Sequence, residues 1–574
     1  MKLVLGNEAI ARGLYEAGVK VVSSYPGTPS TEITEYAATY NEMKCEWAPN
    51  EKVALEVAVG ASIGGARSFA GMKHVGLNVA ADPLFTAAYT GVNGGLVIAV
   101  ADDPGMHSSQ NEQDSRYYAK ASKTLMLEPS DSSECVSFTK KAFELSEKFD
   151  TPVFIRLSTR ISHSRGIIEE TDRNEAGVKD YVKDAAKYVM MPSNARGRHI
   201  IVEKKLEAVR EYAESTELNK IEYNSKEIGI VASGIAYQNA KEAMGNKASY
   251  LKLGMVCPLP KKLIEEFASK VKTLYVIEEL EPFFEEYIKT LGLKVIGKEM
   301  FSICGELSAQ LIKEKLLNEK EQSVSVDIST PVRPPVLCPG CPHRGTFYML
   351  KKLKLTVSGD IGCYTLGANA PLSAMDITLC MGASISGLHG FNKARAELGS
   401  EQNTVAVIGD STFIHSGITG LINIAYNNSN STVLILDNST TGMTGHQQNP
   451  STGYNIKNEP ATAVDIPLLC KAVGINRVFT VDPFDVSGLE ILLKEELAYP
   501  APSVIIVKRP CALLKSVKAQ PVMKIDKDNC KNCKVCMKIG CPCITAGESN
   551  PEINADLCVG CGLCKSICKF NAIN

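Results

Sequence analysis

The chain has 574 residues, more than one hydrophobic core normally organises, so we expect several domains of ordinary size. Its 64 acidic and 62 basic residues nearly cancel, which excludes the strongly basic surface of a nucleic-acid or membrane-surface binder. The N-terminal MKLVLGNEAI lacks the pattern of a secretory signal, and the longest apolar runs are too short to span a bilayer, so we predict a cytoplasmic protein with no nucleic-acid or membrane partner.

Residues 1–165 form the first predicted domain. Apolar strands alternate there with helical stretches, which is typical of a parallel α/β sheet covered on both faces. Glu51 begins a helical stretch, and a glutamate at such a position is usually solvated and stabilised by the helix dipole. His74 and His107 could bind a carboxylate or move a proton, but each is explained equally well as a loop histidine with a satisfied hydrogen bond.

Residues 166–320 are predicted to form a second α/β unit with a preceding connector. The charged stretch 169–187 is predicted as helix plus connector. Apolar strands separated by helical segments are predicted at 226–234, 248–256 and 272–279. This unit carries no cofactor motif, so we assign it a scaffold and interface role. The polar, proline-bearing segment 318–335 is predicted as a linker.

Residues 330–515 form the third predicted domain and carry a candidate cation site. The apolar runs 404–410 and 431–438 predict two buried parallel strands of one βαβ unit. Asp410 and Asn438 would then lie at neighbouring strand ends, where ligands of open α/β sheets bind. Their oxygens suit magnesium, which in turn binds a diphosphate.

Glycine-rich turns lie near these strands, at 359–367 and 380–390. Their glycines would let the backbone approach a cofactor closely, and the helix start after Ser411 offers N–H groups to phosphates. Without these turns, an ordinary Rossmann-type strand pair with a polar end would be the preferred interpretation. The residues of these turns predicted to contact a cofactor are Gly362, Gly382, Ala383 and Ser384.

Cysteines crowd the fourth predicted domain, residues 520–574, which holds nine of the 19. A reducing compartment argues against disulfides, and the spacings are C-x2-C-x2-C-x4-C-P and C-x2-C-x2-C-x3-C. These runs resemble two-cluster bacterial ferredoxins, in which the fourth cysteine of each run binds the other cluster. That resemblance assigns Cys530, Cys533, Cys536 and Cys568 to one 4Fe-4S cluster, and Cys558, Cys561, Cys564 and Cys541 to the second.

The cassette departs from the ferredoxin pattern in three ways. The first run has one extra residue before Cys541, Lys569 stands where the second run usually carries proline, and Cys543 competes with Cys541 for the crossing role. Zinc sites are the alternative, but zinc needs cysteine pairs and not doubled triplets with a remote fourth cysteine. The domain is too short to bury much of a core without its clusters.

The chain as a whole resembles thiamine diphosphate-dependent 2-oxoacid:ferredoxin oxidoreductases, and most of all the alpha subunits of indolepyruvate ferredoxin oxidoreductases. The magnesium signature of thiamine enzymes is matched by Gly409-Asp410-Ser411 and Asn438, in the GDSTF form of that family, and YPGTPST resembles its YPxTPS loop. The implied order of domains is pyrimidine-binding (1–165), transketolase C-terminal-like (166–320), diphosphate-binding (330–515) and ferredoxin-like α+β (520–574).

The resemblance also implies roles for individual residues. Asp410, Asn438 and the backbone carbonyl of Thr440 would bind magnesium. Thr28 would lie close to the substrate carboxylate. Glu51 would bond the aminopyrimidine ring of thiamine, so that the ring's amino group can remove the C2 proton. The candidate catalytic residues are Glu51, Thr28 and His74.

A third, proximal 4Fe-4S cluster is implied by four further cysteines. Pyruvate ferredoxin oxidoreductases hold such a cluster with a C-x2-C pair, a third cysteine further on and a fourth near the domain end. That order is matched by Cys338, Cys341, Cys363 and Cys511. The alternative is that these are small buried hydrophobic residues. The cysteines without ligand spacing are assigned to the core: Cys45, Cys135, Cys257, Cys304, Cys380 and Cys470.

The implied reaction is the oxidative decarboxylation of an aryl pyruvate with coenzyme A to an aryl-acetyl-CoA, CO2 and reduced ferredoxin. The implied partners are a smaller beta subunit in an alpha2beta2 assembly, and ferredoxin. The implied cofactors are thiamine diphosphate, Mg2+ and the 4Fe-4S clusters. Another 2-oxoacid:ferredoxin oxidoreductase is an alternative, because pocket contacts decide the substrate. A non-redox thiamine decarboxylase would need no clusters, and an electron-transfer module would need no thiamine site.

Overall fold

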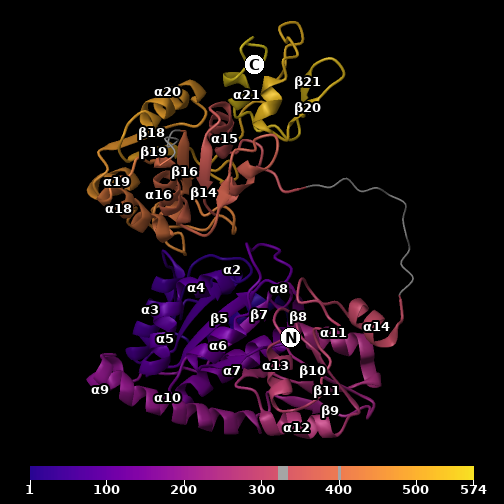
Figure 1. Cartoon of the computed structure of the whole chain (residues 1–574). Coiled ribbons are helices and arrows are strands. Elements are labelled where there is room, and N and C mark those ends of the chain that lie inside the picture. The colour runs from indigo at the N-terminus through magenta and orange to yellow at the C-terminus, as the bar shows by residue number, and fades with distance from the viewer. Residues whose placement is uncertain (321–333, 398–402) are drawn as a thin grey trace. The chain divides into compact units, whose positions relative to one another are not determined.

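The computed structural model describes residues 1–320, 334–397 and 403–574 (Figure 1). The chain divides into two compact units, residues 1–327 and 328–574, which are described separately. Most of the linker predicted at 318–335 lies outside the described residues. Among the described residues, no helix is both long enough and apolar enough to cross a membrane.

The first unit contains a seven-stranded sheet in the order β12-β6-β7-β5-β4-β2-β3, parallel except for β12. Alternate strand residues face opposite sides, so Val97 packs against helices α1, α2 and α7 while Ile98 packs against α3, α4 and α5. The strands are β2 (Val21–Ser24), β3 (Lys44–Trp47), β4 (Ser68–Lys73), β5 (Leu96–Asp102), β6 (Leu125–Leu127), β7 (Val153–Ser158) and β12 (Met255–Cys257). The helices are α1 (Gly6–Glu16), α2 (Thr31–Ala37), α3 (Glu51–Ile63), α4 (His74–Val79), α5 (Ala81–Thr90), α6 (Arg116–Ser122), α7 (Ser132–Phe149) and α8 (Thr159–His163).

A two-stranded ribbon closes this part of the chain. The N-terminal strand β1 (Lys2–Leu5) pairs antiparallel with β8 (Arg165–Ile168). The boundary predicted at residue 165 therefore falls on the first residue of a strand that belongs with the N-terminal elements.

The second part of this unit has a four-stranded sheet in the order β13-β10-β11-β9. The predicted strand 248–256 is wrong as one element, because the chain turns at Gly254 and its last residues form β12 of the first sheet. The strands are β9 (Lys220–Glu222), β10 (Ile228–Ala232), β11 (Ser249–Lys252) and β13 (Thr273–Ile277). The helices are α9 (Ala185–Tyr188), α10 (Pro192–Ala213), α11 (Gly234–Met244), α12 (Lys261–Ser269), α13 (Phe283–Thr290) and α14 (Ala309–Leu317).

The two sheets of the first unit share one core. Leu251 and Phe284 from the second part pack in the same cluster as Leu55 and Ile98 from the first. The long helix α10 runs along this unit from α9 towards α12 (Figure 1). The second α/β part is thus a structural support of the first sheet.

The charged stretch 169–187 is extended up to residue 184, so the helix predicted there is wrong except for its last residues. Its backbone instead docks on the first domain: the Asn174 N–H donates to Glu16 O at 2.9 Å and the Lys179 N–H to Gly65 O at 3.0 Å. These bonds satisfy backbone groups that a helix would have satisfied internally.

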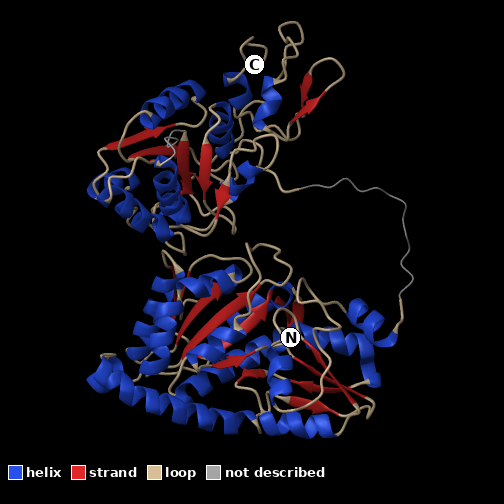
Figure 2. Ribbon diagram, viewed as in Figure 1, coloured by secondary structure: helices blue, strands red, loops and turns tan. Residues whose placement is uncertain are grey.

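The second unit is built on an all-parallel six-stranded sheet in the order β15-β14-β16-β17-β19-β18, with helices on both faces (Figure 2). The predicted strands 404–410 and 431–438 are confirmed as the adjacent β16 and β17. The strands are β14 (Thr356–Gly359), β15 (Ile377–Thr378), β16 (Thr404–Gly409), β17 (Thr432–Asp437), β18 (Arg477–Val481) and β19 (Ser503–Lys508). The helices are α15 (His343–Lys352), α16 (Ala383–Ala396), α17 (Asp410–Thr412), α18 (Ile418–Tyr426), α19 (Ile466–Ala472) and α20 (Val486–Leu497).

The cysteine-rich C-terminal segment has little regular structure: a hairpin of β20 (Ile544–Ala546) and β21 (Pro551–Ile553), and the short helix α21 (Leu563–Ser566). Ile539 and Leu563 of this segment belong to the same hydrophobic cluster as Phe347 of α15 and Leu434 of β17. The segment therefore packs on the six-stranded domain and shares its core.

A buried arginine ties the two sheets of the first unit together. Arg116 is 1% exposed and donates to Asp114 at 2.9 Å, to Glu278 at 2.6 Å and to the carbonyl of Glu279 at 3.1 Å. Burial alone would raise the pKa of Asp114, but Arg116 and Arg156 more than offset this and lower it. Each buried charge in this network is thus stabilised by the opposite charges of its partners.

We expect Arg116→Met to lower the free energy of unfolding by about 3–5 kcal/mol, because it leaves Asp114 and Glu278 buried without their cation. Lys272→Ala is the matched control, since its ion pair with Glu227 is exposed and should contribute at most about 1 kcal/mol. Chemical denaturation of the full chain measures both. Equal losses in the two variants would show that the buried network does not hold the sheets together.

Glu279, beside this network, makes stability depend on pH. Burial raises its pKa to about 7 although its carboxylate accepts the Leu307 N–H at 3.0 Å. The folded state holds a proton that the unfolded chain releases near its ordinary pKa, so this contribution to stability is present at low pH and is lost as pH rises towards 7. We expect Glu279→Gln to stabilise the chain by about 2–3 kcal/mol at pH 8 and by almost nothing at pH 4. Melting curves at both pH values test this, and a gain independent of pH would contradict it.

Candidate active site and thiol groups

Asp410 and Asn438 come together at the ends of β16 and β17, as their positions after parallel strands predict. Both are buried, as is Thr440. In one orientation of the Asn438 amide, its Nδ2 donates to Asp410 Oδ1 at 3.1 Å and to Thr440 O at 2.8 Å. In the other orientation three oxygens face one another, an arrangement that is favourable only around a cation. The three oxygens therefore suit Mg2+ in one orientation of the amide, and in the other orientation the amide satisfies them by hydrogen bonds.

The second carboxylate oxygen of Asp410 is held by residues that sequence reasoning missed. Asp410 Oδ2 accepts from Ser451 Oγ at 3.0 Å and from Asn449 Nδ2 at 3.4 Å. Burial, followed by the nearby charge of Asp437, raises the pKa of Asp410 to about 7. A cation bound at Asp410 would compensate for both effects.

At the start of α16, the turn predicted to contact a cofactor makes hydrogen bonds within the chain. The N–H groups of Gly382 and Ser384 donate to the buried Asp360, each at 3.0 Å, and the Ala383 N–H donates to Cys380 O at 3.1 Å. Asp360 thus acts as a cap of this helix, and these N–H groups are already paired.

Glycines 362 and 409 make room for the aromatic ring of Tyr364. A Cβ at Gly362 would lie 2.4 Å from the Tyr364 ring, and one at Gly409 would lie 2.7 Å from the same ring. Ser411 lies in α17, where its hydroxyl accepts from Thr441 Oγ1 at 3.0 Å. Both glycines therefore allow Tyr364 to approach the backbone closely, and the contact of Gly362 with a cofactor stays a prediction.

Four cysteines gather in this domain, and we call them the inner thiol group: Cys338, Cys341, Cys363 and Cys511. Burial raises the pKa of Cys341 to about 12, and Cys338 and Cys363 lie near enough to raise it further. The Cys511 pKa is raised by burial and by Cys338. Of the four, only Cys341 is fully buried, so their convergence from separate segments favours a shared ligand over simple core packing.

The inner thiol group adjoins the Asp410–Asn438 pair. The backbone N–H of Cys511 donates to Asn438 O at 2.9 Å. A Cβ at Gly442 would lie 3.5 Å from both Cys363 Sγ and Asn438 Nδ2. Neighbouring strand ends therefore hold both the oxygen ligands and the thiols.

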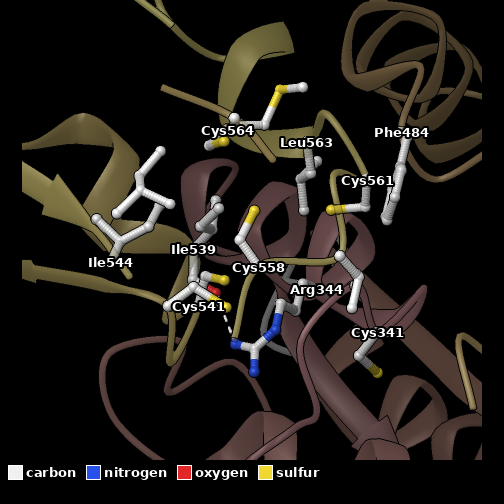
Figure 3. Close-up of a pocket in the computed structure, with 15 residues that line it drawn as sticks. Cys341, Arg344, Phe484, Ile539, Cys541, Ile544, Cys558, Cys561, Leu563 and Cys564 are labelled. Atoms are coloured by element: carbon white, nitrogen blue, oxygen red, sulfur yellow. Dashed lines mark hydrogen bonds between the residues drawn. The ribbon is translucent and has the colours of Figure 1, made fainter. Parts of the chain in front are cut away.

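The C-terminal cysteines form two further groups around separate cavities. The first ferredoxin group lines one cavity and consists of Cys530, Cys533, Cys536 and Cys568. The second ferredoxin group lines the other (Figure 3) and consists of Cys541, Cys558, Cys561 and Cys564, with Cys543 beside them. Each cavity thus combines three cysteines of one run with a fourth from the other run, which is the crossing expected of two cubane clusters.

In the first unit, Thr28, Glu51 and His74 follow the adjacent parallel strands β2, β3 and β4. Glu51 is only 4% exposed, and a Cβ at Gly76 would lie 2.5 Å from its Oε1. Asn50 caps the helix instead, accepting the Val53 N–H at 2.9 Å. The interpretation of Glu51 as a solvated helix-start residue is therefore wrong.

The other predicted residues of this site differ in burial. His74 is 1% exposed, and its Nε2 lies 3.1 Å from Asn111 O. Burial lowers its pKa, which favours the neutral ring. Thr28 is half-buried in its loop, and its carbonyl accepts from Ser108 Oγ at 3.1 Å. His107 is an exposed loop histidine 3.0 Å from Glu306.

Family models match three parts of the chain. Residues 12–229 match the family described as "Pyruvate flavodoxin/ferredoxin oxidoreductase, thiamine diP-bdg", residues 360–507 match "Thiamine pyrophosphate enzyme, C-terminal TPP binding domain", and residues 551–574 match "4Fe-4S binding domain". The indolepyruvate oxidoreductase subunit IorA of Archaeoglobus fulgidus is 40% identical, covering 99% of this chain and 97% of its own length. The chain belongs to the IorA family.

A second IorA protein, from Thermococcus kodakarensis, is 38% identical and covers 99% of this chain and 96% of its own length. Among solved structures, a 2-oxoglutarate:ferredoxin oxidoreductase from Magnetococcus marinus aligns at 19% identity with a TM-score of 0.47, covering 55% of this chain and 65% of its own. That structural likeness is too low to carry an argument. The IorA family is thus supported over the full length by sequence alone.

For this IorA family member, some cysteines predicted to be core residues are not. Cys304 and Cys380 are exposed because they lie in loops, whereas Cys45 is half-buried on the edge strand β3 and packs against the core. The other three are buried as predicted: Cys135, Cys257 and Cys470.

We expect Cys541→Ala to remove about four iron atoms per chain and Cys543→Ala to remove none. Cys541 lies near enough to raise the pKa values of both Cys561 and Cys564. Iron analysis of the anaerobically purified variants tests this. Loss of iron from Cys543→Ala alone would identify Cys543 as the crossing ligand.

Proposed function

We propose that this chain is the catalytic subunit of an indolepyruvate ferredoxin oxidoreductase. It would convert an aryl pyruvate and coenzyme A to an aryl-acetyl-CoA and CO2, with two electrons passing to ferredoxin. The observation that supports this most directly is the bond from the Cys511 N–H to Asn438 O. It places four cysteines suited to bind an electron-accepting cluster beside the residues suited to bind magnesium and a diphosphate.

When bound, thiamine diphosphate supplies the carbon nucleophile for decarboxylation, and the clusters supply one-electron acceptors. Asp410, Asn438 and the carbonyl of Thr440 would hold the magnesium. Glu51, which is only 4% exposed, would bond the aminopyrimidine nitrogen through its carboxyl group. The Thr28 hydroxyl would donate to the substrate carboxylate. A smaller beta subunit, in an alpha2beta2 assembly, and ferredoxin would complete the enzyme.

Two alternative functions would require different residues in the chain. A non-redox thiamine decarboxylase has no use for three cysteine groups, two of them lining separate cavities. Another 2-oxoacid:ferredoxin oxidoreductase would use the same groups with a different substrate pocket, but the full-length relatives are named for indolepyruvate.

The test is an anaerobic assay of the chain with its small subunit, following ferredoxin reduction with indolepyruvate and coenzyme A. We expect Glu51→Gln to lower turnover on the order of 10²–10⁴-fold while thiamine diphosphate still binds, because only proton transfer is impaired. Asp410→Ala should instead abolish cofactor binding. Glu56→Gln is the matched control, since this exposed glutamate on the same helix pairs only with Lys52.

Each outcome separates the candidate functions. Reduction that depends on coenzyme A and aryl pyruvates supports the proposal. CO2 release without acceptor reduction would establish the decarboxylase, and reduction with 2-oxoglutarate but not with aryl pyruvates would establish a different 2-oxoacid enzyme.

A further inference from the structure

Arg344 lies at the start of α15, between the inner thiol group and the second ferredoxin group. It is 2% exposed, which is unusual for an arginine. In Figure 3 its guanidinium lies between Cys341 and Cys541, and the dashed line joins it to the Ile539 carbonyl. The proposed function assigns Arg344 no role.

The guanidinium bonds carbonyls from two loops. From the loop of the inner thiol group, it donates to Cys338 O at 3.2 Å and to Leu337 O. From the loop that leads into Cys541, it donates to Ile539 O at 3.1 Å and to Gly540 O. One rigid, planar group thus holds the backbone beside ligands of two different thiol groups.

The two loops also touch directly. A Cβ at Gly340, between Cys338 and Cys341, would lie 2.6 Å from Val559 and 3.6 Å from the Cβ of Cys561. Gly340 has φ of +70°, so a side chain there would be strained as well. The backbone of the inner thiol group's loop therefore lies directly against the side chains of Val559 and Cys561 in the loop of the second ferredoxin group.

The charge of Arg344 is balanced by no carboxylate within ion-pair distance among residues 1–320, 334–397 and 403–574. Burial lowers its pKa, and the groups that act against this are the thiols of Cys541, Cys341, Cys338 and Cys543. An isolated buried cation is costly, so the arrangement is favourable when anionic thiolates surround it.

We propose that Arg344 is a positioning residue that joins the inner thiol group to the second ferredoxin group and raises the reduction potentials of the clusters bound at both. This rests on the proposed function only in assigning clusters to the thiol groups. Each cluster becomes more negative when it accepts one electron, and a fixed buried cation beside it stabilises that reduced form.

The test is a redox titration of the full-length chain, purified anaerobically and followed by electron paramagnetic resonance, without substrate or thiamine diphosphate. In Arg344→Gln we expect two of the three clusters to shift to more negative potentials, by about tenfold in the reduced-to-oxidised ratio, or about 59 mV for a one-electron couple. The first ferredoxin group should not shift, since Arg344 makes no contact with it. In Arg344→Lys the potentials of both clusters should stay close to those of the unmodified chain, because lysine keeps the charge.

Lys538→Gln is the matched control, since this exposed lysine lies next to Ile539 in the 3-10 helix Val535–Ile539 but its charge is screened by water. Unchanged potentials in Arg344→Gln, or equal shifts of all three clusters, would overturn the proposal. If Arg344→Gln loses iron, Arg344→Lys decides: intermediate potentials with full iron content support the role, and iron loss from every group overturns it. Fewer than three clusters in the unmodified chain would instead contradict the cofactor assignment, independently of Arg344.

Discussion

The parallel pairing of β16 with β17 and of β17 with β19 is the constraint on which the second unit depends. Parallel strands end at one edge of the sheet, so residues far apart in the chain meet there without long connections. Asp410, Asn438 and Cys511 each follow one of these strands. The sheet thereby makes neighbours of an oxygen ligand set and a thiol group, and any chemistry that couples the two depends on this alignment.

Several charged side chains are buried, and the charge is compensated differently at each site. In the first unit, Arg116 and its acidic partners are buried together, so each charge is compensated within the protein. At Asp410 burial is left uncompensated apart from hydrogen bonds, and its pKa rises to about 7. Arg344 is also buried, and within the described part of the chain it has no carboxylate partner. The incomplete compensation at Asp410 and Arg344 marks them as positions where a bound group of opposite charge fits.

The C-terminal segment depends on packing as much as on its cysteines. Its hairpin and short helix could not bury a core alone. Ile539, Ile544 and Leu563 complete a cluster begun by α15 and α20, so the segment is anchored on the six-stranded domain. That anchoring keeps the second ferredoxin group beside the inner thiol group, which a ferredoxin on a free linker would not achieve.

The sequence by itself determined much of the chain, because period and spacing are local properties. Apolar runs ending in Gly-Asp and Asp-Asn were enough to predict β16, β17 and the meeting of Asp410 with Asn438. The resemblance of the doubled cysteine triplets to two-cluster ferredoxins predicted which thiols share each cavity, with Cys541 and Cys543 left as alternatives for one position. Tertiary structure alone decided the burial of Glu51, the capping of α16 by Asp360, the transfer of Met255–Cys257 to the first sheet and the extended path of 169–184. It also decided the place of Arg344. Each of these depends on contacts between segments that are distant in the chain. Such contacts override local propensity and produce no periodic pattern in the sequence, so the pattern could not predict them.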